Sequence, residues 1–203
     1  MKVCVFLDNG HGKNIKGKCS PCKKLYEWKY CREIVKRIKE QLDILNIEYF
    51  EVTPEENDIS LTQRVKRINN KYSELKKSGY VCFLISIHVN AAKSDGKWHN
   101  ASGFTVWVSK NSSNNSKKLA QIIYNEAKGE GLKGNRWIPE CLYFQQNYTI
   151  LYRTNCPAIL TENLFQDNLS DVNYLLSEDG KETITRIHVN AIKKYIDNII
   201  CES

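Results

Sequence analysis

The chain has 203 residues, of which 41% are hydrophobic and 26% are charged, with 10 Gly and 4 Pro. This is ordinary globular composition, so it excludes collagen-like, coiled-coil and low-complexity chains. At this length a single domain buries roughly 70% of the surface of its unfolded chain, which is enough for a core without disulfide staples. We therefore expect one catalytic or binding domain over residues 1–203.

The net charge is +7, from 30 Lys and Arg residues against 23 Asp and Glu residues. The basic residues are dispersed, which favours a diffuse attraction to an anionic polymer, either nucleic acid or bacterial cell wall. A solvated basic surface without such a partner has the same composition. No stretch approaches the ~20 apolar residues of a membrane span. The first apolar run meets Asp8 at once, too early for a signal peptide. We expect a protein made in the cytoplasm that either stays there or is released by another route, unless the sequence is given without its leader. We also expect a monomer.

Five apolar, β-rich runs alternate with five segments of helical period along the chain. The strands are expected at 3–7, 48–52, 80–87, 103–108 and 158–161, and the helices at 24–45, 61–77, 116–128, 167–176 and 181–200. This alternation predicts an α/β fold: a single three-layer domain with a mostly parallel twisted sheet and helices on both faces. The run at 80–87 is almost continuously apolar, as in a central strand buried on both faces.

Two connections between these elements have distinct compositions. The polar stretch 109–116 is rich in Ser and Asn and predicts a loop whose side chain caps the following helix. The stretch 129–152 has no clear period and carries several aromatic residues. It is either a loop that lines a cleft or a surface loop whose aromatics pack on the sheet.

The eight cysteines are expected to be reduced, because the core is large and no export signal is visible. Cys19 and Cys22 have the Cys-x-x-Cys spacing, but a structural zinc site needs two further ligands and no second such pair exists. A local metal or disulfide role for this pair and a coincidence in a loop both stay open.

Polar residues follow three of the expected strands. His11 comes after the first, His88 after the central strand, and Glu162 at the end of the last. In open α/β sheets, ligands bind at the carboxyl ends of the strands. A single histidine at a strand end is commonly a satisfied polar residue, but here two of the 4 histidines take such positions.

Glu27 lies on the apolar stripe of the first expected helix, in line with Cys31, Ile34 and Ile38. A carboxylate there either complements the helix N-terminus or faces the core, where an unpaired charge is costly. A divalent metal shared with His11 and His88 would provide the partner. Two histidines and one glutamate around an open fourth position form a catalytic zinc ligand set, and Glu162 is then free to act as base. Spacing alone does not identify a metalloenzyme, because no short H-E-x-x-H signature is present.

Four motifs in the same order resemble the zinc-dependent N-acetylmuramoyl-L-alanine amidases, the amidase_3 family. They are His11 in Leu-Asp-Asn-Gly-His-Gly, Glu27 at the head of a helix, Ser-Ile-His-Val-Asn-Ala at 86–91, and Pro-Ala-Ile-Leu-Thr-Glu-Asn-Leu-Phe-Gln-Asp-Asn at 157–168. The resemblance covers nearly the whole chain and extends to Arg64 in the second expected helix and to Arg136.

The resemblance implies a role for each matched position. His11, Glu27 and His88 would bind one Zn²⁺ per domain, and Glu162 would be the catalytic glutamate. The implied reaction is hydrolysis of the amide between the lactyl group of N-acetylmuramic acid and L-alanine in peptidoglycan. Asn90 and Arg136 would contact substrate or support the site structurally. Peptidoglycan is then the expected anionic partner, and nucleic acid has no supporting motif. A protein without a visible leader fits a phage endolysin or a bacterial autolysin.

The chain also departs from the family pattern. The segment 12–19 lacks the second glycine and the acidic residue expected after the histidine, and Asn163 and Leu164 stand where Thr and Gly are common. An alternative is therefore a catalytically impaired, peptidoglycan-binding domain of the same fold. A third hypothesis is a hydrolase with Cys82 or Cys156 as nucleophile and His88 as base. Cys82 lies six residues from His88, about 20 Å along an extended strand.

Overall fold

A mostly parallel, six-stranded sheet forms the centre of the computed structural model, which describes residues 2–132 and 137–201. The strand order is β2-β1-β3-β6-β4-β5, and of the paired strands only β4 and β6 run antiparallel among the described residues. The strands are β1 (Lys2–Asn9), β2 (Glu48–Glu51), β3 (Tyr80–Asn90), β4 (Thr105–Val108), β5 (Phe144–Gln145) and β6 (Ala158–Phe165). The expected α/β class is confirmed.

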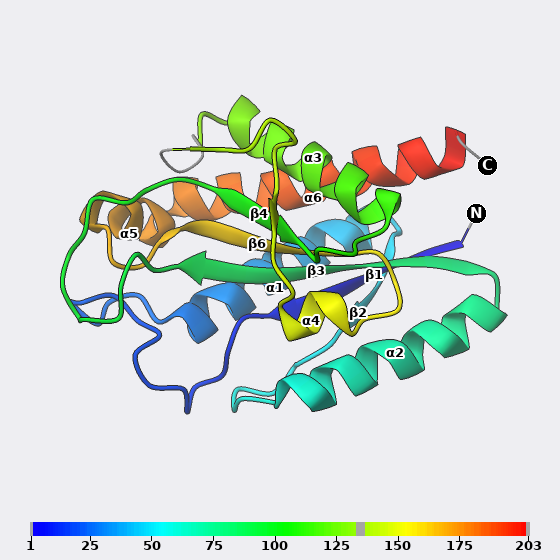
Figure 1. The fold of residues 1–203 in the computed structure, drawn as a ribbon, viewed down its shortest axis with the longest axis horizontal. Coiled ribbons are helices and arrows are strands. Elements are labelled where there is room, and N and C mark those ends of the chain that lie inside the picture. Colours follow the sequence, from blue (N-terminus) through cyan, green and yellow to red (C-terminus); the bar gives the residue numbers. More distant parts are fainter. Residues whose placement is uncertain (1, 133–136, 202–203) are drawn as a thin grey trace.

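Helices cover both faces of this sheet (Figure 1). They are α1 (Glu27–Ile44), α2 (Leu61–Lys77), α3 (Asn114–Gly129), α4 (Thr149–Tyr152), α5 (Leu169–Leu176) and α6 (Glu178–Cys201). One core cluster joins the sheet to α1, α3, α5 and α6, and a second joins the other face to α2 and α4. These two cores make the three layers that the sequence predicts. No described helix is long and apolar enough to cross a membrane.

Side-chain caps fix where several helices begin. Ser113 precedes α3 and accepts a hydrogen bond from the Ser116 N–H at 3.2 Å, which confirms the cap expected in the polar stretch 109–116. Ser60 precedes α2 and accepts from the Gln63 N–H at 3.3 Å. Each cap satisfies one of the amide donors that a helix leaves unpaired at its N-terminus.

Three strands are longer than the sequence indicates: β1, β3 and β6. β3 continues to Asn90 and β6 to Phe165, so His88 and Glu162 lie within these strands and not at or after their C-terminal ends. The cause is pairing between neighbours: His88 lies opposite Glu162 in the β3–β6 ladder, before a register shift between His88 and Asn90. Polar side chains in these strands thus stand side by side on one edge of the fold.

The stretch 129–152, which has no clear period, contains the short elements β5 and α4. β5 adds to the sheet edge beside β4, where Trp107 stacks on Phe144 with ring centroids 4.7 Å apart. Tyr148 packs edge-on against Trp107 at 5.6 Å. Both expectations for the aromatic residues therefore hold in part, because some pack on the sheet while Tyr148 also lines a cleft.

Candidate active site

Three residues from different elements meet at the carboxyl end of the parallel strands. His11 follows β1, Glu27 begins α1, and His88 lies near the end of β3. The His11 Nε2 atom lies 3.6 Å from Glu27 Oε2, and the His88 Nδ1 atom lies 3.1 Å from Glu27 Oε1. One ligand atom from each residue lies within 4.8 Å of the others, which is the spacing of a group able to hold a metal ion.

Glu27 is 1% exposed, as its place on the apolar stripe predicts. Its Oε1 atom accepts a hydrogen bond from the Val89 N–H at 3.1 Å, but its buried Oε2 atom has no hydrogen-bond partner. Burial raises the pKa of this carboxyl, but the hydrogen bond with His88 and the charges of both histidines outweigh it and hold the pKa below its usual value. A buried carboxylate oxygen without a partner, facing two imidazoles, fits a cation.

Hydrogen bonds orient the His88 ring for such a role. Ser86 Oγ donates to Asp8 Oδ2 at 2.6 Å, so it is left to accept from His88 Nε2, which lies 3.1 Å away. The neutral tautomer of His88 then carries its proton on Nε2 and presents the Nδ1 lone pair beside Glu27. Burial lowers the pKa of His88, but the hydrogen bond and charge of Glu27 outweigh it and raise the pKa. A metal and a proton thus compete for Nδ1.

His11 is held in an unusual backbone conformation. Its φ is 55°, in the left-handed region that few residues other than glycine adopt. Arg32 Nη1 donates to the His11 carbonyl at 3.0 Å, and Arg64 Nη2 donates to the same oxygen at 3.3 Å. Burial lowers the pKa of the His11 ring to about 4. The ring is therefore neutral at neutral pH and has a lone pair available to a cation.

Gly10 allows His88 to take its place. A Cβ atom on Gly10 would lie 2.8 Å from His88 Nδ1 and 2.8 Å from the Ile87 carbonyl oxygen. Any larger residue would displace either the ring or the strand. The sequence marked the Asn-Gly-His-Gly motif, and the structure supplies the steric reason for its first glycine.

Arg64 ties the backbone around His11 to α2. It is 3% exposed and pairs with Asp8 and Asp58, each at 2.9 Å, and it also donates to the Asn9 carbonyl.

Replacing Arg64 by methionine leaves the buried Asp8 carboxylate without its cation. Because breaking a buried ion pair costs about 3–5 kcal/mol, we expect the urea midpoint to fall by a corresponding amount at unchanged slope.

The matched control is Arg186→Met. Arg186 pairs with Glu130 at 2.6 Å, but its side chain is 46% exposed, so we expect a loss below about 1 kcal/mol. If Arg64→Met is no less stable than this control, the Arg64–Asp8 ion pair does not stabilise the fold around His11.

Glu162 lies in β6 beside this group and lines the same cleft as His11 and His88. Burial raises the pKa of its carboxyl to about 7, the charge of His88 acts against the rise, and that of Glu27 adds to it. Its buried Oε2 atom has no hydrogen-bond partner. A carboxyl with these properties is poised to exchange protons near neutral pH.

The residues that depart from the family pattern next to Glu162 have definite places. Asn163 is buried and its Nδ2 donates to the His88 carbonyl at 2.8 Å, which braces β3 against β6. Leu164 has a φ of 62°, a conformation that suits the glycine common at this position, and its side chain is buried in the core. Neither change places an obstacle between Glu162 and the two histidines.

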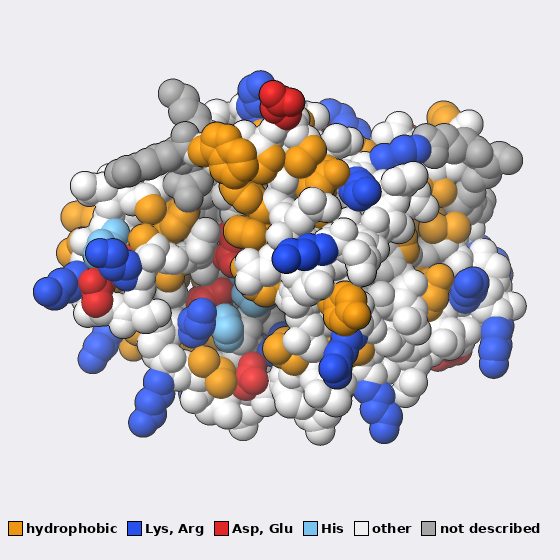
Figure 2. All heavy atoms as spheres, in the orientation of Figure 1, with side chains coloured by type: hydrophobic (Ala, Val, Ile, Leu, Met, Phe, Trp, Pro, Cys, Tyr) orange, Lys and Arg blue, Asp and Glu red, His pale blue; other side chains and the backbone are white. Residues whose placement is uncertain are grey.

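These side chains open onto a cleft of about 660 Å³. Figure 2 shows histidine and carboxylate side chains recessed in a hollow of this face. One wall comes from the β1–α1 connection with Ile15 and Lys18, and the opposite wall comes from the α4 region with Asn147 and Tyr148. The sequence reasoning gave Lys18, Asn147 and Asp8 no role of their own, because it does not show which of these side chains face the cleft.

Asn90 and Arg136 are the two remaining residues expected at the site. The Asn90 side-chain oxygen accepts a hydrogen bond from the Ala91 N–H at 2.8 Å and Asn90 does not line the cleft, so its contact with substrate stays a prediction. Arg136 lies outside the described residues. The other two histidines lie outside the site: His188 is buried with its Nε2 atom 3.0 Å from Thr161 Oγ1, and His99 Nε2 lies 2.9 Å from Asp95 Oδ1.

The cysteines give no support to a nucleophile. Burial raises the pKa of Cys82 to about 11, and it also raises that of Cys156. Neither lines the cleft, and a buried thiol of raised pKa is unreactive. Cys19 and Cys22 carry free thiols and belong to no metal-binding group among the described residues.

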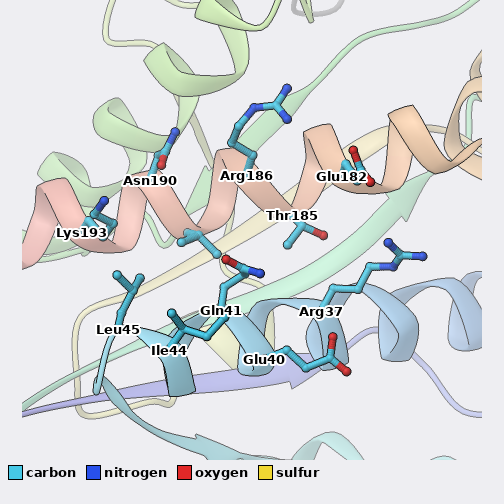
Figure 3. Close-up of a pocket in the computed structure, with 11 residues that line it drawn as sticks. Arg37, Glu40, Gln41, Ile44, Leu45, Glu182, Thr185, Arg186, Asn190 and Lys193 are labelled. Carbon is cyan, nitrogen blue, oxygen red and sulfur yellow. The ribbon is translucent and has the colours of Figure 1, made fainter.

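A second groove lies between α1 and α6 (Figure 3). Charged and amide side chains such as Arg37, Glu182 and Lys193 dominate its lining. It contains no member of the His11, Glu27 and His88 group.

Comparisons with known proteins identify the family and the fold. Residues 5–194 match the Amidase_3 family, described as N-acetylmuramoyl-L-alanine amidase. The chain is 28% identical over 197 residues to the "Probable cell wall amidase LytH" of Staphylococcus epidermidis, covering 96% of this chain but 58% of that protein. It is 25% identical over 204 residues to the endolysin of Bacillus phage SPP1, covering 97% of this chain and 67% of that one.

A solved structure, the N-acetylmuramoyl-L-alanine amidase from Clostridium difficile 630, superposes with a TM-score of 0.81 at 27% identity, and 97% of each chain is covered. The family match spans nearly all of the sheet and helices described above. The chain therefore belongs to the Amidase_3 family of N-acetylmuramoyl-L-alanine amidases.

Proposed function

We propose that this chain is a zinc-dependent peptidoglycan hydrolase that cuts the amide between the lactyl group of N-acetylmuramic acid and L-alanine. The observation that carries the proposal is the meeting of His11, Glu27 and His88 beside the buried carboxyl of Glu162 in one cleft. The family and its relatives, named cell wall amidase and endolysin, support the same substrate. Residues 1–203 would act as one catalytic domain.

The three ligands suit zinc by their chemistry. Two imidazoles and one carboxylate leave a fourth position open, the arrangement of catalytic zinc sites. A zinc ion held there would supply Lewis-acid polarisation of the scissile carbonyl and make a water molecule more acidic. The unpartnered Glu27 Oε2 atom, the neutral His11 ring and the Nδ1 face of His88 supply the donors.

Glu162 moves the proton in this proposal. Its carboxylate takes a proton from the attacking water and then gives it to the nitrogen of L-alanine as the amide bond breaks. Burial raises the pKa of this carboxyl to about 7 and a cation held beside it lowers that value, so the carboxyl is ionised and able to accept a proton near neutral pH. Burial also supports the role of Glu162 as the base, because few bulk water molecules can form hydrogen bonds to its carboxyl oxygens.

A catalytically impaired wall-binding domain has no observation in its favour. Asn163 and Leu164 support the strand and core and leave Glu162 lining the cleft. Segment 12–19, which also departs from the family pattern, leaves His11 and Glu27 3.6 Å apart.

The decisive test is release of L-alanine amino termini from purified sacculi. We expect the zinc-loaded protein to release them, release to stop after chelation, and addition of zinc to restore it. New amino termini are labelled and identified as alanine, and mass spectrometry of the products checks that the muramoyl sugar is intact. Reducing ends in place of alanine termini, or full activity after chelation, would contradict the proposal.

A further inference from the structure

Another pocket, of about 600 Å³, adjoins the cleft on the side of the β1–α1 connection, and we call it the lysine pocket. Four lysines and one glutamate supply its charged lining, together with two aromatic rings: Lys13, Lys16, Lys18, Lys29, Glu56, Tyr26 and Trp28. Ile15 and Lys18 line both this pocket and the cleft. The lysine pocket therefore lies next to the proposed reaction site.

The positive charge of the lysine pocket is poorly compensated within the protein. Lys13 pairs with Glu56 at 3.4 Å. Lys16, Lys18 and Lys29 have no carboxylate within ion-pairing distance in the parts of the chain that the structure describes. Lysines gathered around a concave surface attract anions, because low-dielectric walls concentrate their field.

Backbone contacts hold the pocket in a fixed place beside the ligand residues. The Glu27 N–H donates to the Lys18 carbonyl at 3.0 Å, and Cys19 forms an antiparallel bridge with Tyr26. At the other end of the segment, the Lys13 N–H donates to the Glu56 carbonyl at 2.7 Å. The hydrogen bond at Glu27 fixes Lys18 next to the proposed zinc ligand, and the Lys18 ammonium interacts electrostatically with His11, Glu27 and Glu162.

The opposite wall of the cleft differs in chemistry. Tyr148 lines this wall and its ring packs on Trp107. The aromatic contacts extend from Trp107 to Phe144 and from Phe144 to the exposed ring of Trp137. Aromatic faces suit neutral ligands with apolar patches, such as a sugar ring. A substrate with a neutral sugar on one side of the scissile amide and an acidic peptide on the other thus meets two unlike walls.

We propose that the lysine pocket binds a carboxylate of the stem peptide beyond L-alanine, and so selects stems whose acidic residue is not amidated. The proposal rests on the proposed function, because it places the peptide side of the cut amide on the Lys18 wall. Tyr26 and Trp28 provide apolar surface for the peptide's methylene groups. A phosphate-bearing wall polymer has the same sign of charge, but the pocket's place directly beside the cleft favours a group on the substrate itself.

Two muropeptides that differ in one group test the inference: disaccharide peptides with D-glutamate or with D-isoglutamine after L-alanine. We expect KM to be about tenfold lower for the glutamate form, the size of one charge-assisted hydrogen bond, with similar kcat. The double variant Lys16→Gln/Lys29→Gln should reduce this preference below twofold. The matched double variant Lys77→Gln/Lys193→Gln removes the same charge from exposed lysines outside the pocket and should keep it.

Equal KM for the two substrates in the wild type, or a preference that survives in Lys16→Gln/Lys29→Gln, would overturn the inference. If inorganic phosphate inhibits the wild type but not this variant while the two substrates remain equal, the pocket is a phosphate site and the inference is wrong. Cleavage of neither substrate marks failure of the proposed function. In that case, calorimetry with the free stem peptides tests the lysine pocket separately. The inference requires that binding depends on the peptide carboxylate and on Lys16 and Lys29.

Discussion

Replacing Glu162 by glutamine is expected to lower the rate of alanine release by about 10²–10⁴-fold, the usual contribution of a general base, while zinc binding is retained. Glutamine keeps the size of the side chain but cannot take a proton from water. Glu162 is not one of the three clustered ligands, so its loss leaves the metal group complete. The rate is measured on sacculi, and metal content is measured by emission spectroscopy on the same preparation.

The exposed glutamate Glu178, at the start of α6, provides the control. Glu178→Gln makes the same chemical change at a residue that does not line the cleft and should release alanine at the wild-type rate. If Glu162→Gln also hydrolyses normally, another group is the base. If it loses zinc, Glu162 has been given the wrong role.

The pH dependence gives a second readout of Glu162. Burial raises the pKa of its carboxyl to about 7, and the base works only in the ionised form. Activity must therefore rise with pH until the carboxyl is ionised and fall as pH decreases through its pKa. A cation nearby favours ionisation, so we expect the acidic limb of kcat/KM at or below pH 7. This limb should be missing from the residual activity of Glu162→Gln, and a profile that is flat there in the wild type would contradict the role.

The four central residues were accessible to sequence reasoning because each one interrupts a pattern. His11 and His88 appear where apolar runs end, and Glu27 stands on an otherwise apolar helix stripe. Parallel strands bring their carboxyl ends to one edge, so residues at strand ends are expected to meet. The structure adds that His88 and Glu162 are cross-strand neighbours within β3 and β6. Strand ends are set by pairing with neighbours, which one segment of sequence does not reveal.

The hydrogen bonds and ion pairs that support the site could largely not be predicted by the same reasoning. The path from His88 through Ser86 and Asp8 to Arg64 joins three elements, and Arg64 lies 56 residues from Asp8. No local pattern marks such a contact, because each residue taken alone reads as an ordinary polar side chain. The lysine pocket is similar: Lys13 and Lys29 are dispersed in the sequence and gather only because the β1–α1 connection folds back on itself.

Replacing Glu27 by glutamine is expected to remove both zinc and activity, in contrast to Glu162→Gln. Glutamine fills the same buried space and its oxygen can still accept from the Val89 N–H. Its neutral amide, however, gives the cation no negative charge. Loss of even an outer-shell partner costs metal sites about 10–100-fold in affinity, so loss of the one carboxylate ligand should cost more than about 100-fold.

Competition with a metal-sensitive dye measures this affinity, and the alanine assay is run at saturating zinc. His188→Gln is the matched control, because His188 is buried and hydrogen-bonded but lies outside the metal group. It should bind zinc as the wild type does, whatever it costs in stability. If Glu27→Gln keeps wild-type zinc affinity, the orphaned Glu27 Oε2 atom does not face the metal. A variant that binds zinc weakly but recovers full activity at saturating zinc would limit Glu27 to holding the ion, whereas activity that stays low would show that its charge also sets the reactivity of the site.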